Sequence, residues 1–239
     1  MTDSACAVYI YYADRRSLSE QTVAALVTAE DRLRVTPTMH ARRRTEYLAG
    51  RALLRHALGA CTGRDGASFR IEVAAYGKPE CVAGPAISVS HSGDVVVCAV
   101  ADRAIGDLGI DVETGHPREV DEIAERFFTP TEARWVAAEP EARFPMLWVL
   151  KEAYLKALGS GLAGGLSSLE CQIEPPAVVA RTADGAAVPQ LVLLAGQGGC
   201  YVGIAALGGS SRVEPIVRRF AVGDGADALG PLQLIARSE

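Results

Sequence analysis

The apolar residues of this chain occur in short runs of strand length, and these runs alternate with amphipathic segments of helix length. Ala7–Tyr12 and Val95–Ala101 are typical runs, and both are far shorter than the roughly 20 residues that a transmembrane helix requires. No basic segment precedes Ala7–Tyr12, so we expect neither a signal peptide nor a membrane span. The alternation predicts an α/β (α+β) protein.

The same patterns place the individual elements along the chain. Branched and aromatic residues predict strands at Ala7–Tyr12, Phe69–Ala75, Ile87–Ser90, Val95–Ala101, Leu108–Glu113, Leu169–Ile173, Gln190–Leu194, Cys200–Ala205 and Pro215–Phe220. Helical spacing predicts helices at Ser17–Val35, Ala41–Leu58, Glu119–Phe128 and Phe144–Leu158. A further helix starts at Thr129, where Thr129 and Glu132 have the spacing of a capping box. The polar stretch Asp102–Asp107 is the predicted boundary between two halves.

Composition narrows the classes of protein that this chain can be. The six cysteines form no C-x-x-C pair, which indicates reduced thiols in the cytoplasm instead of a disulfide or zinc framework. The net charge of −5 gives no overall attraction to nucleic acid or to anionic membranes. We therefore expect a cytoplasmic protein without a nucleic-acid partner, in which any anion site is local.

Lysine is rare in this chain. Of the 24 basic residues only three are lysines, namely Lys78, Lys151 and Lys156. Arginine presents a planar fork, whereas the lysine ammonium is a compact charge that suits a phosphate oxygen. The three lysines therefore mark candidate positions for a required ammonium, although drift in codon use would also explain them.

Two acidic residues alternate at the end of a predicted strand. In the sequence Gly-Ile-Asp-Val-Glu, Asp111 and Glu113 are two positions apart and point to the same face of the strand. They could share one cation, and Mg²⁺ prefers such oxygen ligands. Taken alone, the same pattern is more often a solvated strand end.

A second segment places three functional side chains on one face of a helix. Trp148, Glu152 and Lys156 are four positions apart, so they stack along that face. Glu152 would complete a set of three carboxylates if the helix lay against the acidic strand. Taken alone, Glu152 and Lys156 would form an ordinary surface ion pair.

Together the two segments resemble the signature of the surfactin-type phosphopantetheinyl transferases, Gly-Ile-Asp-x-Glu followed by Trp-x-x-Lys-Glu-Ala-x-x-Lys. Upstream, the Gly-Lys-Pro around Lys78 and the Ser-Val-Ser-His-Ser-Gly from Ser88 match elements that the family has in the same order. Arg-Phe-Phe at 126–128 and the later Glu132 also fall where the family has them. The matching region, Gly77–Lys156, covers about a third of the chain.

The resemblance implies both a fold and an activity. The fold is a pseudo-twofold pair of similar halves, here residues 1–106 and 107–239, with coenzyme A in the cleft between them. The activity is transfer of the 4′-phosphopantetheine arm of coenzyme A to a serine of an apo acyl or peptidyl carrier protein, with release of 3′,5′-ADP. Such carriers serve polyketide and nonribosomal peptide synthesis. We expect a monomer.

The resemblance also implies residue roles. Asp111, Glu113 and Glu152 would bind Mg²⁺, and Lys156 would contact the pyrophosphate. Glu152 would take the proton of the carrier serine, directly or through a water. Glu132 is left outside this set, because its capping role explains it.

The 3′-phosphate of coenzyme A has its own predicted ligands. Lys78, Ser90 and His91 match the family here. The family also uses basic residues near the start of the chain, where an ungapped comparison offers Asp31 beside Arg32 and Arg34. Arg43, Arg44 and Arg51 are further candidates, and Arg44 and Arg51 are the ones we predict, although the arginine run could be a solvated helix start.

The carrier is expected to dock at the mouth of the cleft. The predicted surface is the helix Glu119–Phe128 with the following segment to Trp135, including Arg126 and Arg134. Carrier proteins present acidic helices, so local arginines would steer the encounter even though this chain is acidic overall.

Three other classes of protein fit this sequence less well than a phosphopantetheinyl transferase. A serine hydrolase would need its serine within reach of a base, and adjacent Ser90 and His91 point to opposite faces of a strand without a G-x-S-x-G elbow. A non-catalytic coenzyme A-binding module would keep Lys78 and His91 but would not need three acids. A nucleic-acid-binding protein would need a basic surface, and the pI is near 5.5.

Overall fold

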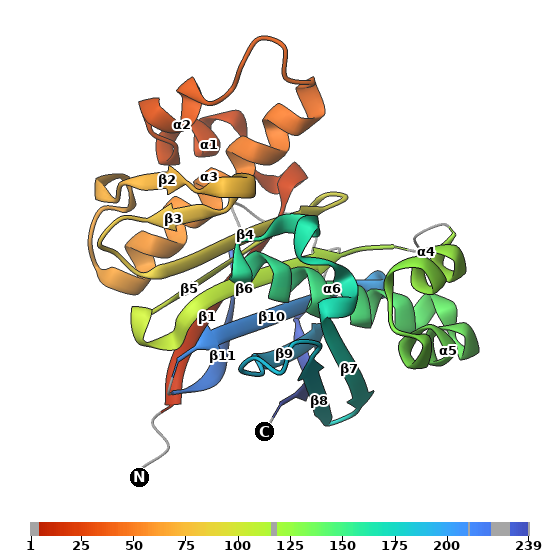
Figure 1. Cartoon of the computed structure of the whole chain (residues 1–239). Helices are drawn as coiled ribbons and strands as arrows, with labels where there is room; N and C mark the ends of the chain where they lie inside the picture. The colour runs from red at the N-terminus through yellow and green to blue at the C-terminus, as the bar shows by residue number, and fades with distance from the viewer. Residues whose placement is uncertain (1–4, 116–118, 210, 221–229, 239) are drawn as a thin grey trace.

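The computed structural model describes residues 5–115, 119–209, 211–220 and 230–238. Its helices are α1 (Glu20–Leu26), α2 (Ala29–Leu33), α3 (Ala41–Thr62), α4 (Val120–Phe127), α5 (Pro130–Ala138) and α6 (Pro140–Leu158). Its strands are β1 (Ala5–Asp14), β2 (Ile71–Val73), β3 (Pro79–Cys81), β4 (Ala86–Ser92), β5 (Val95–Ala101), β6 (Gly106–Glu113), β7 (Leu169–Glu174), β8 (Ala177–Thr182), β9 (Gln190–Ala195), β10 (Tyr201–Gly208), β11 (Arg212–Arg219) and β12 (Gln233–Arg237). Figure 1 shows them in chain order.

The strands form two large sheets and one small one. The four-stranded sheet has the order β11-β1-β5-β4, and the six-stranded sheet has the order β6-β10-β9-β12-β8-β7. β1, β5 and β4 pair antiparallel, as do β6, β10 and β9. β2 and β3 form a separate pair beside the first sheet. The two halves therefore repeat one unit of three antiparallel strands.

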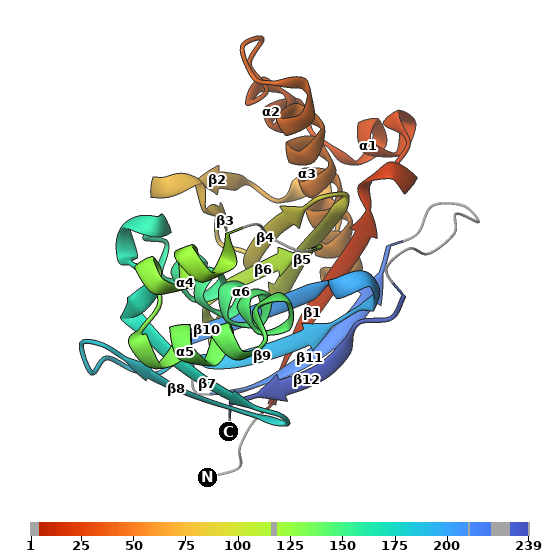
Figure 2. The ribbon, with the colours of Figure 1, turned by 90° about the vertical axis from the view of Figure 1, so that its right-hand side faces the viewer.

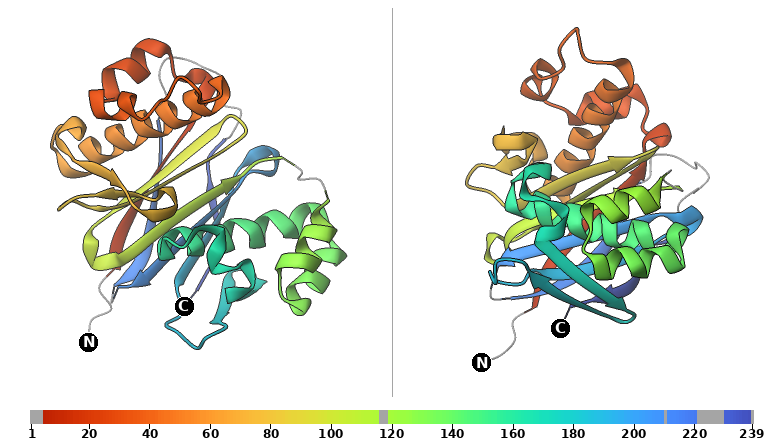
Figure 3. Two further views of the ribbon diagram at one scale, coloured as in Figure 1. Left: turned by 45° about the horizontal axis from the view of Figure 1, so that its top comes forward. Right: turned by 45° about the vertical axis from the view of Figure 1, so that its right-hand side comes forward.

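The two large sheets pack face to face, and each carries a long helix on its outer side. Alternate residues such as Ile10 and Val97 meet Ile110 and Ile204 between the sheets. The opposite faces pack against α3 in the first half and against α6 in the second half. Figure 3 shows α3 and α6 on opposite sides of the strands. α4 and α5 lie beside α6 (Figure 2).

Each long helix is set by its local sequence. α3 begins after His40, whose ring nitrogen accepts a hydrogen bond from the backbone N–H of Arg42, and ends at Gly63. α6 begins at Pro140 and ends at Gly159. Gly63 and Gly159 have φ of 69° and 67°, a left-handed conformation that glycine adopts at little cost when it ends a helix.

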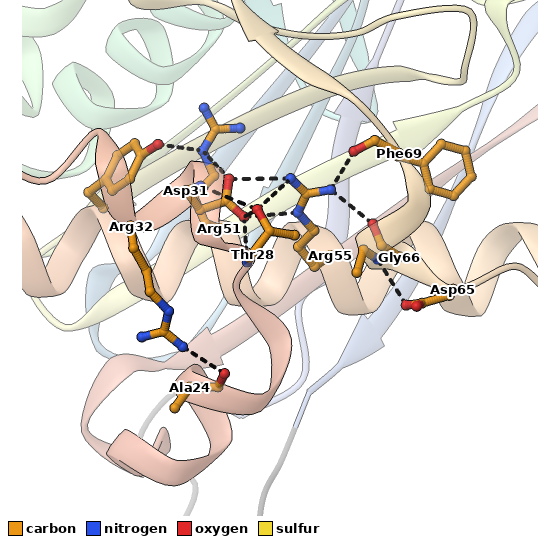
Figure 4. Close-up of polar contacts among 11 residues, drawn as sticks. Ala24, Thr28, Asp31, Arg32, Arg51, Arg55, Asp65, Gly66 and Phe69 are labelled. Carbon is orange, nitrogen blue, oxygen red and sulfur yellow. Dashed lines mark hydrogen bonds and ion pairs between the residues drawn. The ribbon is translucent and has the colours of Figure 1, made fainter.

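A buried cation fixes each long helix to a shorter one. Arg55 of α3 holds Asp31 of α2 through both carboxylate oxygens, at 3.0 and 3.3 Å (Figure 4). Lys151 of α6 lies 2.8 Å from Glu132 of α5. All four side chains are buried, and each acid also closes a capping box at the start of its own helix.

The predicted fold class is confirmed, with local differences. Ser17–Val35 is two helices instead of one, because Val27 and Thr28 are extended and Thr28 caps α2. The helix predicted from Phe144 starts four residues earlier, with Pro140 in its first turn. β3, β8 and β12 were not predicted.

One strand departs from a simple division of the chain. β11, from the end of the sequence, pairs in parallel with β1 of the first half, with Ala5 opposite Arg212 and Tyr12 opposite Arg219. The boundary at residues 106 and 107 remains a prediction. None of the helices in the described ranges has both the length and the apolar composition of a membrane span.

Candidate active site

The two sheets meet along the edges of β4 and β6, where serines of β4 bridge to β6. Ser88 accepts a hydrogen bond from the backbone N–H of Ile110 at 3.0 Å. Ser92 accepts one from the backbone N–H of Thr114 at 3.2 Å. Ser90 lies between them and donates to Asp111 at 2.7 Å. Because these serines are two residues apart on a strand, they share one face and join the halves along one line.

Two glycines let α6 touch the six-stranded sheet with its backbone. A Cβ on Gly109 of β6 would lie 1.9 Å from the carbonyl oxygen of Ala153, and one on Gly203 of β10 would lie 2.3 Å from that of Val149. Gly203 pairs with Asp111 across the strands. This close approach sets α6 directly above the acidic strand.

Asp111, Ser90 and Lys156 form a closed triangle at the centre of the site. Lys156 Nζ lies 2.6 Å from Asp111 Oδ1 and 2.7 Å from Ser90 Oγ. Asp111 is buried and Lys156 is partly exposed. The ammonium therefore compensates the charge of a carboxylate that the surrounding protein shields from water.

Glu113 is held at the end of the same strand. Its Oε1 accepts hydrogen bonds from Ser92 Oγ at 2.7 Å and from the backbone N–H of Thr114 at 3.0 Å. Glu113 is half-buried, so its carboxylate remains accessible from the cleft.

Glu152 projects from α6 toward these acids. Burial and the negative charge of Asp111 raise the pKa of Glu152, while the ammonium of Lys156 lowers it, and the net direction is upward. A carboxyl group with a raised pKa binds protons more readily than a solvated one, which suits a residue that accepts a proton.

Ser90, Ser92 and the charged groups described above line one cleft of about 720 Å³ between the halves. Asp111, Glu113, Glu152 and Lys156 lie at its floor and along α6. The wall formed by the first half carries cations and aromatic rings, namely Arg34, Arg43, Tyr47, Arg51, Tyr76 and His91. The first half therefore contributes most of the cations of the cleft, whereas the second half contributes three carboxylates and Lys156.

Similarity to known proteins covers both halves of the chain. Residues 30–101 match the model of the 4′-phosphopantetheinyl transferase N-terminal domain, and residues 107–193 match that of the 4′-phosphopantetheinyl transferase superfamily. A 4′-phosphopantetheinyl transferase of Bacillus subtilis is 35% identical over 175 residues, which are 70% of this chain and 76% of that protein. The chain belongs to the 4′-phosphopantetheinyl transferase family.

Two other relatives give the same picture. The transferase Sfp of Bacillus subtilis strain 168 is 30% identical over 70% of this chain and 76% of its own length. The transferase HetI of a Nostoc species is 30% identical over 65% of this chain and 68% of its own length. The match to the transferase family thus extends well beyond the motif region Gly77–Lys156.

The transferase brings together the acids predicted from its sequence, since Asp111, Glu113 and Glu152 line the same cleft with Lys156. In the described part of the chain, however, no three acidic, histidine or cysteine side chains gather closely enough to form a metal-binding cluster. Asp111 is in contact with Lys156 and Ser90 instead.

The predicted anion ligands lie in different places. His91 and Arg51 line the cleft. Ser90 also lines it, but its hydroxyl proton is donated to Asp111. Lys78 lies outside the group that lines this cleft and donates to the carbonyl oxygen of Ala157 at 2.7 Å. Arg44 is not among the lining residues.

On α3, sequence reasoning named Arg43 as a candidate but preferred Arg44, and it did not name Glu46 as a site residue. Arg43 lies in the cleft wall where Arg44 was preferred, because the exact turn of a helix that faces a cleft depends on its rotation about the sheet. Glu46 lies in the same wall and is buried. Their one-turn spacing was the available signal.

Glu132 has the predicted cap and a further role. Its Oε2 accepts from the backbone N–H of Thr129 at 2.9 Å, which confirms the capping box. Its Oε1 accepts from the backbone N–H of Cys171 at 2.8 Å and pairs with Lys151. Glu132 is therefore a buried ion-pair partner as well as a cap.

Proposed function

We propose that this transferase binds coenzyme A and Mg²⁺ in the cleft between its halves and uses Asp111, Glu113 and Glu152 as the metal ligands. The activity itself follows from the family: the 4′-phosphopantetheine arm of coenzyme A is moved to a serine of an apo carrier protein. The observation that carries the metal proposal is the convergence of three carboxylates from β6 and α6 on one cleft.

The donor set fits Mg²⁺. Mg²⁺ prefers oxygen ligands, and in phosphoryl-transfer sites it is usually held by one or two carboxylates together with substrate phosphate oxygens and water. Burial raises the pKa of Glu152 most and the charge of Asp111 raises it further, so a cation between the two carboxylates would favour their charged forms. A bound Mg²⁺ supplies positive charge to the pyrophosphate oxygens.

Each residue of the chain then has a chemical task. The carrier serine oxygen forms a bond to the β-phosphorus of coenzyme A while the bond to the bridging oxygen breaks, and 3′,5′-ADP leaves with that oxygen. Glu152, directly or through a water, accepts the serine proton. Lys156 neutralises charge that develops on the pyrophosphate. Asp111 and Ser90 hold the Lys156 ammonium at 2.6 and 2.7 Å.

The first half supplies the proposed binding site for the 3′-phosphate, with Lys78, Ser90, His91, Arg44 and Arg51 as its ligands. Arg51 gives the best support. It lines the cleft, and its Nη1 is buried with no hydrogen-bond partner among the described residues, although Nε donates to Tyr47 at 3.1 Å. A buried guanidinium nitrogen without an acceptor is costly, and a phosphate oxygen would satisfy it.

The compartment, the oligomeric state and the carriers of the enzyme are also part of the proposal. We expect a cytoplasmic monomer that serves acyl and peptidyl carriers of polyketide and nonribosomal peptide synthesis. All six cysteines are free thiols, as expected in a reducing compartment.

Intact-mass spectrometry tests the proposal. Apo acyl and peptidyl carrier domains are incubated with the enzyme, coenzyme A and Mg²⁺, and the expected result is a mass gain equal to the phosphopantetheine arm. Replacing Asp111 by Asn, or Glu113 or Glu152 by Gln, should lower the rate by a factor of about 10²–10⁴. Glu139→Gln, which removes an exposed carboxylate paired with Arg143, is the matched control and should remain active.

Two results would contradict the proposal. If no carrier gains mass while coenzyme A still binds, the chain is a binding module. If the rate does not depend on added Mg²⁺ after treatment with a chelator, the three carboxylates do not hold a catalytic metal.

A further inference from the structure

Glu46 is a buried carboxylate in the wall of a cleft that has to accept an anion. It lies on α3, is 8% exposed, and lines the cleft together with Arg43 and His91. By charge alone it should weaken the binding of coenzyme A. Glu46 is not one of the proposed metal ligands, so its presence in this wall needs another physical explanation.

The two oxygens of Glu46 face two different basic side chains, Arg42 and His91. Arg42, one turn earlier on α3, donates from Nε to Oε1 at 2.8 Å. His91 of β4 places Nδ1 3.9 Å from Oε2. The Arg42 side chain is 64% exposed, so it holds the carboxylate from the solvent side. The carboxylate thus lies between a solvated guanidinium and a cleft imidazole.

The position of Glu46 decides which imidazole nitrogen of His91 can contact a ligand. With Nδ1 directed at a carboxylate, Nε2 is the nitrogen left for a ligand. A neutral imidazole with its proton on Nδ1 would present a lone pair at Nε2, which repels a phosphate oxygen, whereas an imidazolium donates from both nitrogens.

Four charged groups on three elements act on His91. Burial lowers its pKa most, and Lys156 of α6 and Arg43 of α3 lower it further, whereas Glu46 of α3 and Asp111 of β6 raise it. The net direction is below the ordinary value of 6.5. Without Glu46, the cationic form of His91 would be still less favourable in the free enzyme.

We propose that Glu46 is a positioning residue for His91, which orients the imidazole and stabilises its protonated form so that Nε2–H can donate to a phosphate group of coenzyme A. This inference rests on the proposed function, in which His91 contacts the 3′-phosphate. Glu46 itself does not touch the ligand.

The sign of the effect separates this role from simple electrostatics. Glu46→Gln removes a negative charge from the cleft, and repulsion alone predicts that coenzyme A then binds more tightly. Positioning of His91 predicts weaker binding, by up to about tenfold, because one unit of pKa changes the protonated fraction tenfold. The loss should become smaller as the pH falls, because lower pH favours the protonated form of His91 in both proteins.

The experiment has two readouts. Proton–carbon NMR of the imidazole in the free enzyme gives the pKa of His91 in the wild type, Glu46→Gln and Glu46→Asp. Calorimetry gives the affinity for coenzyme A across pH for the same proteins, alone and combined with His91→Ala. Glu139→Gln is the control, because it removes the acid of another Arg–Glu pair spaced four residues apart, at the start of α6, that does not line the cleft.

The expected result is a lower His91 pKa and weaker binding in Glu46→Gln, partial recovery in Glu46→Asp, and no further loss when His91 is already alanine. An unchanged His91 pKa overturns the proposal, and so does an equal loss of affinity in the His91→Ala background. If His91→Ala alone leaves the affinity unchanged while carriers are still modified, the assignment of His91 fails and this inference with it, but the transferase activity stands.

Discussion

The long helices α3 and α6 carry the same device in the two halves of the molecule. In each, a buried cation binds the capping-box acid of a short helix and two backbone carbonyls just beyond the long helix. Arg55 donates to Asp31 and to the carbonyls of Gly66 and Phe69 (Figure 4). The equivalent bonds of Lys151 go to Glu132 and to the carbonyls at 166 and 169.

The difference lies in the next residue of each helix. After Arg55 comes His56, which packs between the rings of Tyr11 and Phe220. After Lys151 comes Glu152, which lines the cleft. The repeated unit thus fixes both helices in the same way, and only the second half turns the adjacent position into a chemical group. The residue that anchors a long helix and the residue that takes part in the chemistry can therefore be neighbours on that helix and still vary independently.

Removal of the buried cations should give the largest effect. Lys151→Met leaves Glu132 charged and unpaired in the interior, which costs about 3–5 kcal/mol of unfolding free energy. Arg55→Met should cost a similar amount through Asp31 if the two devices are equivalent. Urea denaturation measures both.

The double variant Lys151→Met with Glu132→Gln should recover part of the loss, because no charge is then stranded. From the sequence, Glu132 was expected to contribute only a cap worth about 0.5–2 kcal/mol. A loss within that smaller range for Lys151→Met would mean that the ion pair adds nothing to the cap.

Packing of the two helices should respond differently to an added methyl group. Gly109→Ala places a Cβ 1.9 Å from a backbone oxygen of α6, so the helix has to move, at a cost of about 1–3 kcal/mol and with Glu152 displaced from Asp111. Gly50→Ala on α3 meets side-chain atoms of Val89 at 3.4 Å and of Val96 at 4.0 Å, which is ordinary contact, and should stabilise its helix by up to about 1 kcal/mol. Thermal unfolding and carrier modification rates test the pair, and equal effects would remove the distinction.

The short helices of the two halves should differ in carrier docking. Arg126 of α4 lies over the ring of Phe127, which is 43% exposed, and Arg134 of α5 is exposed. Reversing both charges to Glu should weaken carrier binding by about 1 kcal/mol or less, because the charges are exposed, and so raise the KM for the carrier several-fold. The salt dependence of that KM should also become flatter. Arg32→Glu on α2, in the first half, is the control. Unaltered carrier kinetics would place the docking surface elsewhere.

The smallest expected effect concerns His56. Burial lowers its pKa in the folded protein, so the unfolded chain binds protons first as the pH falls below the ordinary value of 6.5. The stability that depends on neutral His56 is therefore present above about pH 6.5 and declines as the pH falls through that value. His56→Phe should flatten this slope in denaturation curves, and an unchanged slope would assign it to other groups.

The sequence predicted local features better than distant ones. The strand Val95–Ala101 and the cap at Thr129 were predicted correctly, because alternation and capping depend on neighbouring residues. The gathering of Asp111, Glu113 and Glu152 in one cleft was implied by the family resemblance and not by local spacing, because it depends on how α6 lies on β6. The pairing of Lys151 with Glu132 and the contact of Glu46 with His91 were not predicted, since they depend on how separate elements pack.

β11, which belongs to the second half of the chain, pairs with the first sheet and so links the two halves. Its backbone pairs with β1 along eight positions, from Ala5 opposite Arg212 to Tyr12 opposite Arg219. An N-terminal fragment cut after residue 106 would present β1 as an open edge, free to pair with other chains. The halves should therefore unfold in one cooperative step. Two fragments produced separately should not reassemble readily into active enzyme.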